Sequence, residues 1–456
     1  MERGSSREAE LVVLNTCTVT ENADKDARAS IRRLQRINPG CQILVTGCYA
    51  QRAPEEVAAI PGVTWVVGNS HKHQAAAIAL AEFTPPKAEL FSIERLMNSA
   101  AEKIVVGDVF AHTELLAAPV FEAANERTRP NLKVQDGCDN RCSFCVIPYV
   151  RGQSRSLPAE RVISEVQTLV AAGYREVVIS GINLGRWGRD LPSGIESFEE
   201  NRGSSARNQS LIGLVRAILT QTSLEKLRIS SVEPMDWSSE FIELVASSPR
   251  IAKHAHVPMQ SGSDAVLRRM HRKYRPWHYR EKISRIRRAM PSAAIGADVM
   301  VGFPGETEAE FDETRRMIEE LPFTYLHVFT YSPRPGTPAA NASDQVPVEV
   351  ARERNAILRE LATKKKRQFL ESLTGRVVDA ITLNTGTAEF TEALTDNYLK
   401  MRISRVLPPN RWFRVKAESV EGETLLASHC EELGEFSATA KTASDAGAYA
   451  IANRSA

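Results

Sequence analysis

The sequence predicts an α/β protein in three parts: an N-terminal parallel α/β domain, a central partial (β/α) barrel and a C-terminal small β-barrel. Short apolar runs alternate with charged helical segments through most of the chain, which is typical of parallel sheets. After Gly375 the pattern changes to closely spaced β-type runs. With 456 residues the chain is longer than a single domain with one hydrophobic core usually is. The predicted parts span 1–115, 124–372 and 373–435, and a tail of disordered composition follows at 436–456.

The overall composition excludes several classes of protein. No apolar run approaches the roughly 20 residues of a membrane-spanning helix, and the polar start is not a signal peptide. Seven cysteines, an odd number with a close trio, indicate metal ligation in a reducing compartment rather than a disulfide framework. We therefore expect a cytoplasmic protein without membrane association. The net charge of +2 predicts that any contact with RNA comes from local patches.

The N-terminal domain is predicted from three strands and two helices, at 11–14, 42–45, 64–67, 24–37 and 54–59. Cys17 and Cys48 follow the first two strands, and ligands gather where parallel strands end. These two cysteines therefore suit a metal site, although the packing of buried free cysteines explains them equally well. Cys41 and Cys430 are interpreted as structural or incidental.

A compact cysteine loop follows an irregular connector at about 85–125. Cys138, Cys142 and Cys145 are separated by three and then two residues. Thiolates on so short a loop can bind three irons of a cubane and leave the fourth iron open for a small chelating molecule. A zinc knuckle or a disulfide is disfavoured, because zinc loops favour two CxxC pairs and no second pair follows.

The barrel is predicted from five β-type runs, each followed by helical sequence, at 176–180, 226–230, 255–257, 297–301 and 325–329. A stretch at 189–209 has the composition of a surface insertion. Polar residues stand where the strands end, as in the sites of barrel enzymes, and they suit either ligand contact or turns: Ser180, Gly181, Asn183, Glu233, Gln260 and Ser261. The segment 302–307 suits a backbone cradle or a turn that starts a helix at Glu306 or Thr307.

The remaining basic segments favour RNA contact in one place. The segment 268–288 holds ten basic residues and one acid, which suits phosphate contact or a solvated helix face, and the helical stretch 351–373 is equally ambiguous. Short β-type runs then form the last barrel at 376–383, 387–392, 399–403, 412–417 and 424–427. Basic and aromatic residues of this barrel are predicted to bind RNA, with a charged barrel exterior as the alternative: Lys400, Arg402, Arg405, Arg411, Trp412 and Arg414.

Four features occur in the order of one family: the segments 15–20 (NTCTVT) and 46–51 (TGCYAQ), the CxxxCxxC loop with Phe144, and the last barrel. Over about 11–427 the chain resembles the radical S-adenosylmethionine (SAM) methylthiotransferases. The resemblance implies a methylthiotransferase domain with an auxiliary 4Fe–4S cluster, a radical SAM barrel and an RNA-binding TRAM barrel. It also implies that Cys138, Cys142 and Cys145 bind a 4Fe–4S cluster and that Phe144 lies near the SAM adenine.

The family has three branches, and segments 15–20, 134–152 and 326–339 are similar to one of them. That branch adds a methylthio group to C2 of N6-threonylcarbamoyladenosine next to the anticodon of tRNA. The alternatives are the isopentenyladenosine branch, the ribosomal-protein branch and a catalytically impaired RNA-binding iron–sulfur protein. The resemblance implies tRNA and a flavodoxin-type reductant as partners, a monomer, and a 5′-deoxyadenosyl radical chemistry that needs no catalytic acid or base from the protein.

The chain departs from the family in one respect. The family has three auxiliary-cluster cysteines, and none of the sixteen residues before Cys17 is a cysteine. Cys17 and Cys48 match the second and third positions, whereas Cys41 is a poor substitute. We expect either that the chain starts late, through truncation or a misread start, or that the auxiliary cluster is compromised. The opening strand that would carry the first ligand is expected to be missing, which leaves a sheet edge unpaired.

Overall fold

The computed structural model describes residues 7–83, 103–111, 128–192 and 210–433. The N-terminal domain is a parallel sheet in the order β1-β2-β3-β4, formed by Leu11–Thr16, Gln42–Gly47, Val63–Val67 and Ile104–Val105. Its helices are α1 (Glu21–Ile37), α2 (Cys48–Arg52), α3 (Pro54–Ala58) and α4 (Ala75–Phe83), with the 3-10 turn η1 at Asn69–Gln74. Ile31, Ile43 and Val66 are buried in its core.

The predicted strands and the helix at α1 are confirmed, but the connector is not wholly irregular. β4 lies within it and pairs with β3, through register partners Val66–Ile104 and Val67–Val105. A strand of two residues has too short a pattern for sequence periodicity to reveal. The other parts of the connector, 84–102 and 112–127, lie outside the described residues.

The central domain consists of two parallel three-stranded sheets. The first has the order β5-β8-β9 (Asn131–Lys133, Glu176–Ser180, Lys226–Ile229) and the second β10-β11-β12 (His254–His256, Ala294–Val301, Tyr325–Thr330). Bridges from Leu227 to Ile251 and from Ser231 to His256 join them. The covering helices are α6 (Ala159–Ala171), α8 (Leu211–Gln221), α9 (Ser239–Ser247), α10 (Asp264–Arg269), α11 (Pro276–Ala289), α12 (Glu308–Glu320) and α13 (Val348–Glu371).

The ambiguous segment 302–307 is resolved by the helix that follows it. Thr307 caps α12, because its hydroxyl accepts from the Glu310 backbone N–H, and Glu306 accepts from the Gly302 N–H at 2.7 Å. The segment 302–307 is therefore a turn that starts a helix. The predicted insertion at 189–209 lies mostly in 193–209, outside the described residues.

The C-terminal domain is a seven-stranded sheet in the order β17-β18-β15-β14-β13-β16-β19. Its strands, from β13 to β19, are Val377–Gly386, Thr391–Thr395, Lys400–Ile403, Trp412–Lys416, Ser419–Glu421, Thr424–Ala427 and Cys430–Glu432. The run predicted at 387–392 is wrong in its start, because Thr387 N–H bonds to the Phe390 carbonyl in a turn and β14 begins only at Thr391. The predicted tail lies outside the described residues.

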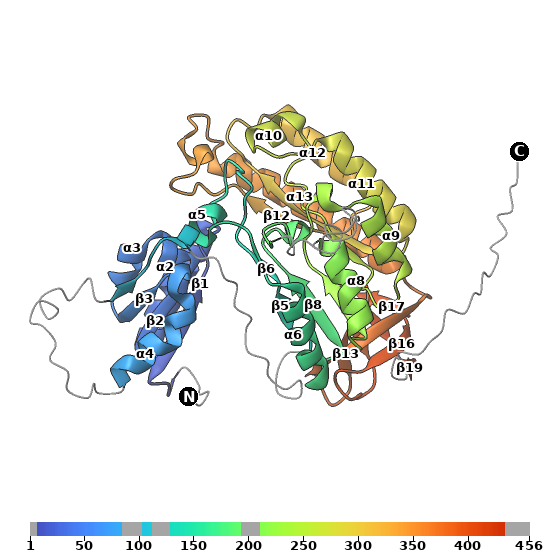
Figure 1. The fold of residues 1–456 in the computed structure, drawn as a ribbon. Coiled ribbons are helices and arrows are strands. Elements are labelled where there is room, and N and C mark those ends of the chain that lie inside the picture. The colour runs from blue at the N-terminus through green and yellow to red at the C-terminus, as the bar shows by residue number, and fades with distance from the viewer. Residues whose placement is uncertain (1–6, 84–102, 112–127, 193–209, 434–456) are drawn as a thin grey trace, which may run out of the picture.

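Figure 1 shows how these parts are placed. The N-terminal domain, blue and on the left, contacts the rest of the molecule near α5 (Ile147–Arg151), and the orange and red C-terminal sheet lies beneath the barrel on the right. Among the described helices, each is too short or too polar to cross a membrane.

Candidate cofactor and substrate site

The cysteine loop connects β6 (Gln135–Asp136) to α5 and is shaped by a glycine. Gly137 has φ +70°, and a Cβ there would lie 1.8 Å from the Gln153 carbonyl oxygen, so no larger residue fits. The Cys138 N–H donates to the Gly152 carbonyl at 3.1 Å, and the Cys145 N–H donates to the Cys142 carbonyl at 3.1 Å. All three cysteines are free thiols on one short turn.

Burial determines the protonation of this loop. It raises the pKa of Cys138, and it raises the pKa of Cys145 to about 12. Without a metal these thiols are therefore neutral at physiological pH. A bound metal ion deprotonates its thiol ligands, so assembly of a cluster here releases protons.

Nitrogen donors face the sulfur atoms. Arg272 Nη1 lies 3.3 Å from Cys142 Sγ, and Asn183 Nδ2 lies 3.7 Å from Cys138 Sγ. Arg272 is 8% exposed and pairs with Glu233. Three free thiols on one short turn, two of which face side-chain N–H donors, suit a 4Fe–4S cluster, so the residues present fit this group. The sequence did not distinguish Arg272 from the other basic residues of 268–288.

The predicted SAM contacts divide into two groups. Asn183 and Glu233 lie beside the cysteine loop, and Asn183 Oδ1 is buried without a partner among the described residues, as is Gln260 Oε1. Gly181 passes close to Gln135, whose Oε1 would be 2.7 Å from an added Cβ. By contrast, Ser261 bonds to Thr314 of α12 at 3.1 Å and Ser180 bonds to Asn131. These two hydroxyls are therefore engaged within the protein.

Phe144 forms part of an apolar wall next to the loop. Its ring lies 6.3 Å from that of Phe303, edge to face at 81°. Met300 and Phe329, neighbours in the register of β11 and β12, belong to the same apolar cluster. This wall suits the flat face of a purine, the role predicted for Phe144.

Cys17 and Cys48 lie at the same edge of the N-terminal sheet. They directly follow Thr16 and Gly47, which are register partners at the ends of β1 and β2. Cys17 is exposed, whereas Cys48 is 2% exposed and lies 3.1 Å from Arg151 Nε. Cys48 packs with Val146, Ile147 and Val150, and the same apolar cluster borders Cys138 and Cys145. Cys48 and the cysteine loop therefore meet at one small apolar cluster.

A buried ion pair holds the two domains in this arrangement. Arg334, which is 3% exposed and follows β12, pairs with Asp24 of α1 and donates to the Thr18 hydroxyl at 3.2 Å. Arg52 also pairs with Asp24, at 2.9 Å. Because Thr18 adjoins Cys17, this network positions the Cys17 turn against the barrel.

We expect Arg334→Met to lower the free energy of unfolding by about 2 kcal/mol, since Asp24 stays buried with only Arg52 as its partner. Denaturant unfolding of the full chain measures this change. Arg367→Met is the matched control, because Arg367 forms an exposed pair with Glu371 and its loss should cost less than about 0.5 kcal/mol. Equal losses in both variants would contradict the role of the buried pair.

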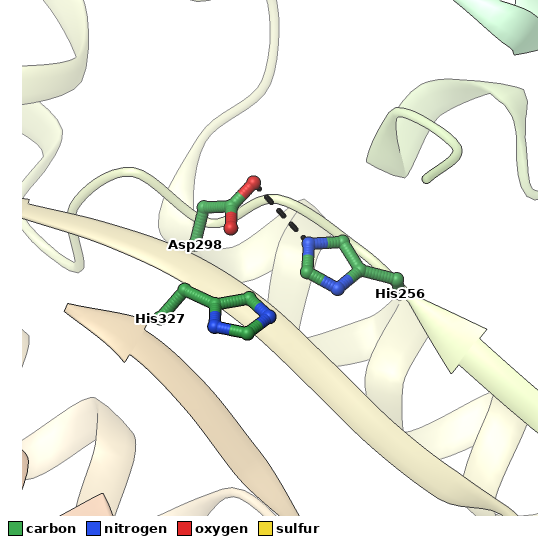
Figure 2. A group of neighbouring side chains, drawn as sticks. All are labelled: His256, Asp298 and His327. Atoms are coloured by element: carbon green, nitrogen blue, oxygen red, sulfur yellow. Dashed lines mark ion pairs between the residues drawn. The ribbon is translucent and has the colours of Figure 1, made fainter. Parts of the chain in front are cut away.

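The inner face of the second barrel sheet carries a polar group that was not predicted. His256, Asp298 and His327 come from β10, β11 and β12, and one atom of each lies within 4.8 Å of the others (Figure 2). His256 Nε2 is 3.2 Å from Asp298 Oδ2. Partial desolvation of the ring, together with the nearby His256, lowers the pKa of His327, so this imidazole is neutral at pH 7. The signal in the sequence was one polar residue on each of three successive strands.

The predicted RNA-binding residues do not form a single patch. Lys400 and Arg402 lie on β15 and line a cavity of about 730 Å³ between the C-terminal sheet, β12 and α13. The strand β16, which is separated from β15 by β14 and β13, contains Trp412 and Arg414 and follows Arg411. Arg405 is exposed after β15. Trp412 is 1% exposed, so the stacking role predicted for its ring is corrected: this ring packs against Ile381 and Leu394 and is covered by Lys226 of the barrel.

Trp412→Ala is therefore expected to destabilise the protein by about 3–5 kcal/mol, the usual cost of removing a large buried ring, rather than to weaken RNA binding selectively. Denaturant unfolding and tRNA affinity measured on the same preparation separate the two effects. Arg414→Ala, on the exposed face of β16, should change stability by less than about 1 kcal/mol. A stable Trp412→Ala protein with weak tRNA binding would restore the stacking role.

Comparison with family models divides the chain in the same way as the fold. Residues 132–318 match the radical SAM superfamily, and residues 2–68 match a family described as uncharacterized protein family UPF0004. The first match contains the cysteine loop and the barrel strands as far as β11, and the second contains Cys17 and Cys48.

Curated relatives match over most of both chains. Threonylcarbamoyladenosine tRNA methylthiotransferase MtaB of Bacillus subtilis is 38% identical, covering 88% of this chain and 83% of its own length. The Aquifex aeolicus protein of the same name is 35% identical, covering 86% and 87%. A tRNA-2-methylthio-N(6)-dimethylallyladenosine synthase of Acidothermus cellulolyticus is 34% identical, covering 82% and 70%. Two substrate classes are thus represented among the relatives.

Among solved structures, the radical SAM methyltransferase TsrM from Kitasatospora setae, with tryptophan and a SAM analogue bound, has a TM-score of 0.51 at 16% identity. The match covers 76% of this chain and 66% of that one. It shows a shared fold.

Proposed function

Because this chain belongs to the radical SAM methylthiotransferases, we propose that it adds a methylthio group to C2 of N6-threonylcarbamoyladenosine in tRNA. The observation that carries the proposal is that Cys48 of the N-terminal domain and two cysteines of the loop, Cys138 and Cys145, belong to one small apolar cluster. A reaction that brings a carbon radical and a sulfur atom to the same substrate carbon needs two such centres close together.

The residues of the chain have distinct tasks in this reaction. Cys138, Cys142 and Cys145 would hold a 4Fe–4S cluster, which with SAM supplies an electron and a carbon-centred radical when bound. Arg272 donates toward Cys142 Sγ and stabilises negative charge there. The apolar wall around Phe144 excludes water from the reacting carbon. No acid–base pair is required from the protein.

We further propose that Cys17 and Cys48 contribute to the auxiliary sulfur-bearing centre. Arg151 supports this role for Cys48, because its Nε donates to Sγ at 3.1 Å while its Nη1 pairs with Asp136 at 3.2 Å. This pairing fixes a cation beside the sulfur, as suits a thiolate ligand. The tRNA would lie along the cavity that Lys400 and Arg402 line. A flavodoxin-type reductant, a monomeric state and a cytoplasmic location complete the proposal.

Mass spectrometry of tRNA nucleosides tests the substrate. Reconstituted protein given SAM, a reductant and tRNA should convert threonylcarbamoyladenosine to its 2-methylthio form and form 5′-deoxyadenosine. Product on dimethylallyladenosine alone would favour the function named for the Acidothermus cellulolyticus relative. RNA binding without either product would indicate an RNA-binding iron–sulfur protein instead.

A further inference from the structure

A cavity of about 800 Å³ lies between the barrel and the C-terminal sheet. Residues of both barrel sheets and of the C-terminal sheet line it, among them Arg228, His254, His256, Tyr325, His327 and Tyr398. It adjoins the cavity of Lys400 and Arg402, since both contain Arg129, His327 and Tyr398 in their walls. An RNA held by the C-terminal sheet therefore has a path into the barrel.

Arg228 is an unsatisfied cation in this cavity. It is 2% exposed, and its Nε donates to Glu176 at 2.6 Å. Both of its terminal nitrogens are buried and lack a partner among the described residues. A buried guanidinium with two unused donors on one edge is costly unless an anion occupies them, and a carboxylate matches that edge with two parallel hydrogen bonds.

The surroundings of Arg228 have room for a further negative charge. Arg129 also lines the cavity and lies 4.0 Å from Glu176, so two guanidinium groups face one carboxylate. His254 adds no charge, because burial and the nearby Arg228 lower its pKa well below the usual range. The excess charge at this end of the cavity is therefore positive.

Tyr398 covers this end of the cavity. Its ring centroid is 5.0 Å from the Arg228 guanidinium and 5.0 Å from the His254 ring centroid. Its backbone has φ +72° in a turn closed by the Tyr398 N–H to Thr395 carbonyl bond at 2.9 Å. The turn is attached to the barrel, since Asn397 Nδ2 donates to the Ser292 carbonyl at 2.9 Å. The C-terminal sheet thus supplies one wall of a pocket otherwise formed by the barrel.

Polar side chains on β11 and β12 lie one register step from the apolar wall of Phe144. Asp298 and His327 are register partners in β11 and β12, and the next pair on the same face is Met300 and Phe329. Those two residues belong to the apolar wall of Phe144. Two residues of strand span about 7 Å, which is about the width of a purine. A substrate base that lies between the Phe144 wall, which is assigned to the SAM adenine, and His327 would therefore place its N6 substituent in the polar pocket.

We propose, on the basis of the proposed function, that this cavity binds the amino-acid side group of the modified adenosine. The Arg228 guanidinium donates to the threonyl carboxylate, and Asp298 and His327 form hydrogen bonds with the hydroxyl and ureido groups. A dimethylallyl group would leave the terminal nitrogens of Arg228 without partners, so this residue selects against the apolar substrate.

Gly296 makes this polar wall possible. A Cβ at Gly296 would lie 2.0 Å from the Tyr325 ring, whose hydroxyl lies 2.7 Å from His254 Nε2 and 3.0 Å from His256 Nδ1. Tyr325 therefore occupies the space of the missing side chain and fixes both imidazoles. The remaining imidazole nitrogen of His256 faces Asp298.

The test compares the binding of three fluorescent anticodon stem-loops to reconstituted protein without reductant. The stem-loops carry threonylcarbamoyladenosine, its methyl ester or plain adenosine. We expect the wild type to bind the acid about 10- to 100-fold more tightly than the ester, the range for a charge-assisted hydrogen bond. Arg228→Lys should reduce this preference to less than about threefold, because the paired donors are lost. Arg216→Lys, on the outer helix α8, is the matched control and should keep it.

His327→Leu provides a second variant, because His327 is exposed and its replacement does not strand a buried charge. It should weaken binding of the stem-loop with the free acid about five-fold, which is the usual effect of losing one hydrogen bond. Binding of the stem-loop with plain adenosine should change little. An equal affinity of the wild type for acid and ester would overturn the proposal, as would an undiminished preference in a folded Arg228→Lys protein. One equivalent of Zn²⁺ retained by the wild type and lost in His327→Leu would also overturn it, since a metal would occupy the same atoms.

A measurement of methylthiolation distinguishes failure of the pocket assignment from failure of the proposed function. Methylthiolation of threonylcarbamoyladenosine without any preference for the acid would reject only the pocket assignment. A wild-type protein that produces no methylthiolated nucleoside would reject the proposed function, and the binding preference would still be measured because it needs no turnover.

Discussion

Cys142→Ala is expected to abolish the reductive cleavage of SAM. The three loop cysteines are the thiols that converge on one turn, and removing one leaves a cubane with two protein ligands. Outer-shell partners of metal ligands already contribute about 10- to 100-fold, so loss of a ligand should lower 5′-deoxyadenosine formation by more than about 100-fold. Chromatography with mass detection measures 5′-deoxyadenosine, and iron analysis of reconstituted protein measures the cluster.

The matched control is Cys41→Ala, a half-buried cysteine at the edge of the N-terminal core. This variant should keep its iron and its SAM cleavage. Normal 5′-deoxyadenosine formation by Cys142→Ala would remove the cysteine loop from the reaction and with it the proposed function.

Cys48→Ala is expected to separate the cleavage of SAM from the formation of the methylthiolated nucleoside. The Cys48 thiol lies across an apolar cluster from the loop and is not part of it, so SAM cleavage should continue. The methylthiolated nucleoside should fall by more than about 100-fold, the same scale as for loss of any metal ligand. The ratio of methylthiolated nucleoside to 5′-deoxyadenosine is the measurement, since it cancels differences in cluster loading.

Val150→Ala controls for packing, because Val150 is buried in the same cluster as Cys48. It should cost about 1 kcal/mol or more of stability and change both products alike. A parallel fall of both products in Cys48→Ala would assign Cys48 to packing, the alternative that the sequence left open.

The cysteine loop and the alternation of strands and helices were predictable because they depend on local patterns. The spacing of Cys138, Cys142 and Cys145 confines their thiols to one turn whatever surrounds them. The runs that became β8, β9 and β11 are mostly buried, as strands covered on both faces require, and β12 is half-buried beside them. The sequence could therefore predict the fold class and the loop without knowledge of long-range contacts.

The missed features depend on residues that are far apart in the sequence. Arg272 lies in a strongly basic segment, and only the fold reveals that it, and not its neighbours, turns inward to Cys142. His256, Asp298 and His327 lie on three strands and meet only through sheet register. Trp412 failed in the opposite direction, because strand alternation puts it on the same face of β16 as the exposed Arg414 and Lys416, and only the fold reveals that the barrel covers its ring.

The contact between Cys48 and the cysteine loop also has a consequence for handling the protein. The apolar side chains that pack against Cys48 belong to α5 and its N-cap, whereas Cys48 belongs to the N-terminal domain, so these side chains cover Cys48 only while the two domains are in contact. Opening them exposes sulfur atoms to dissolved oxygen, which attacks thiolates according to their accessibility. We therefore expect tolerance of air to depend on the contact between the two domains, to which the Arg334–Asp24 pair contributes.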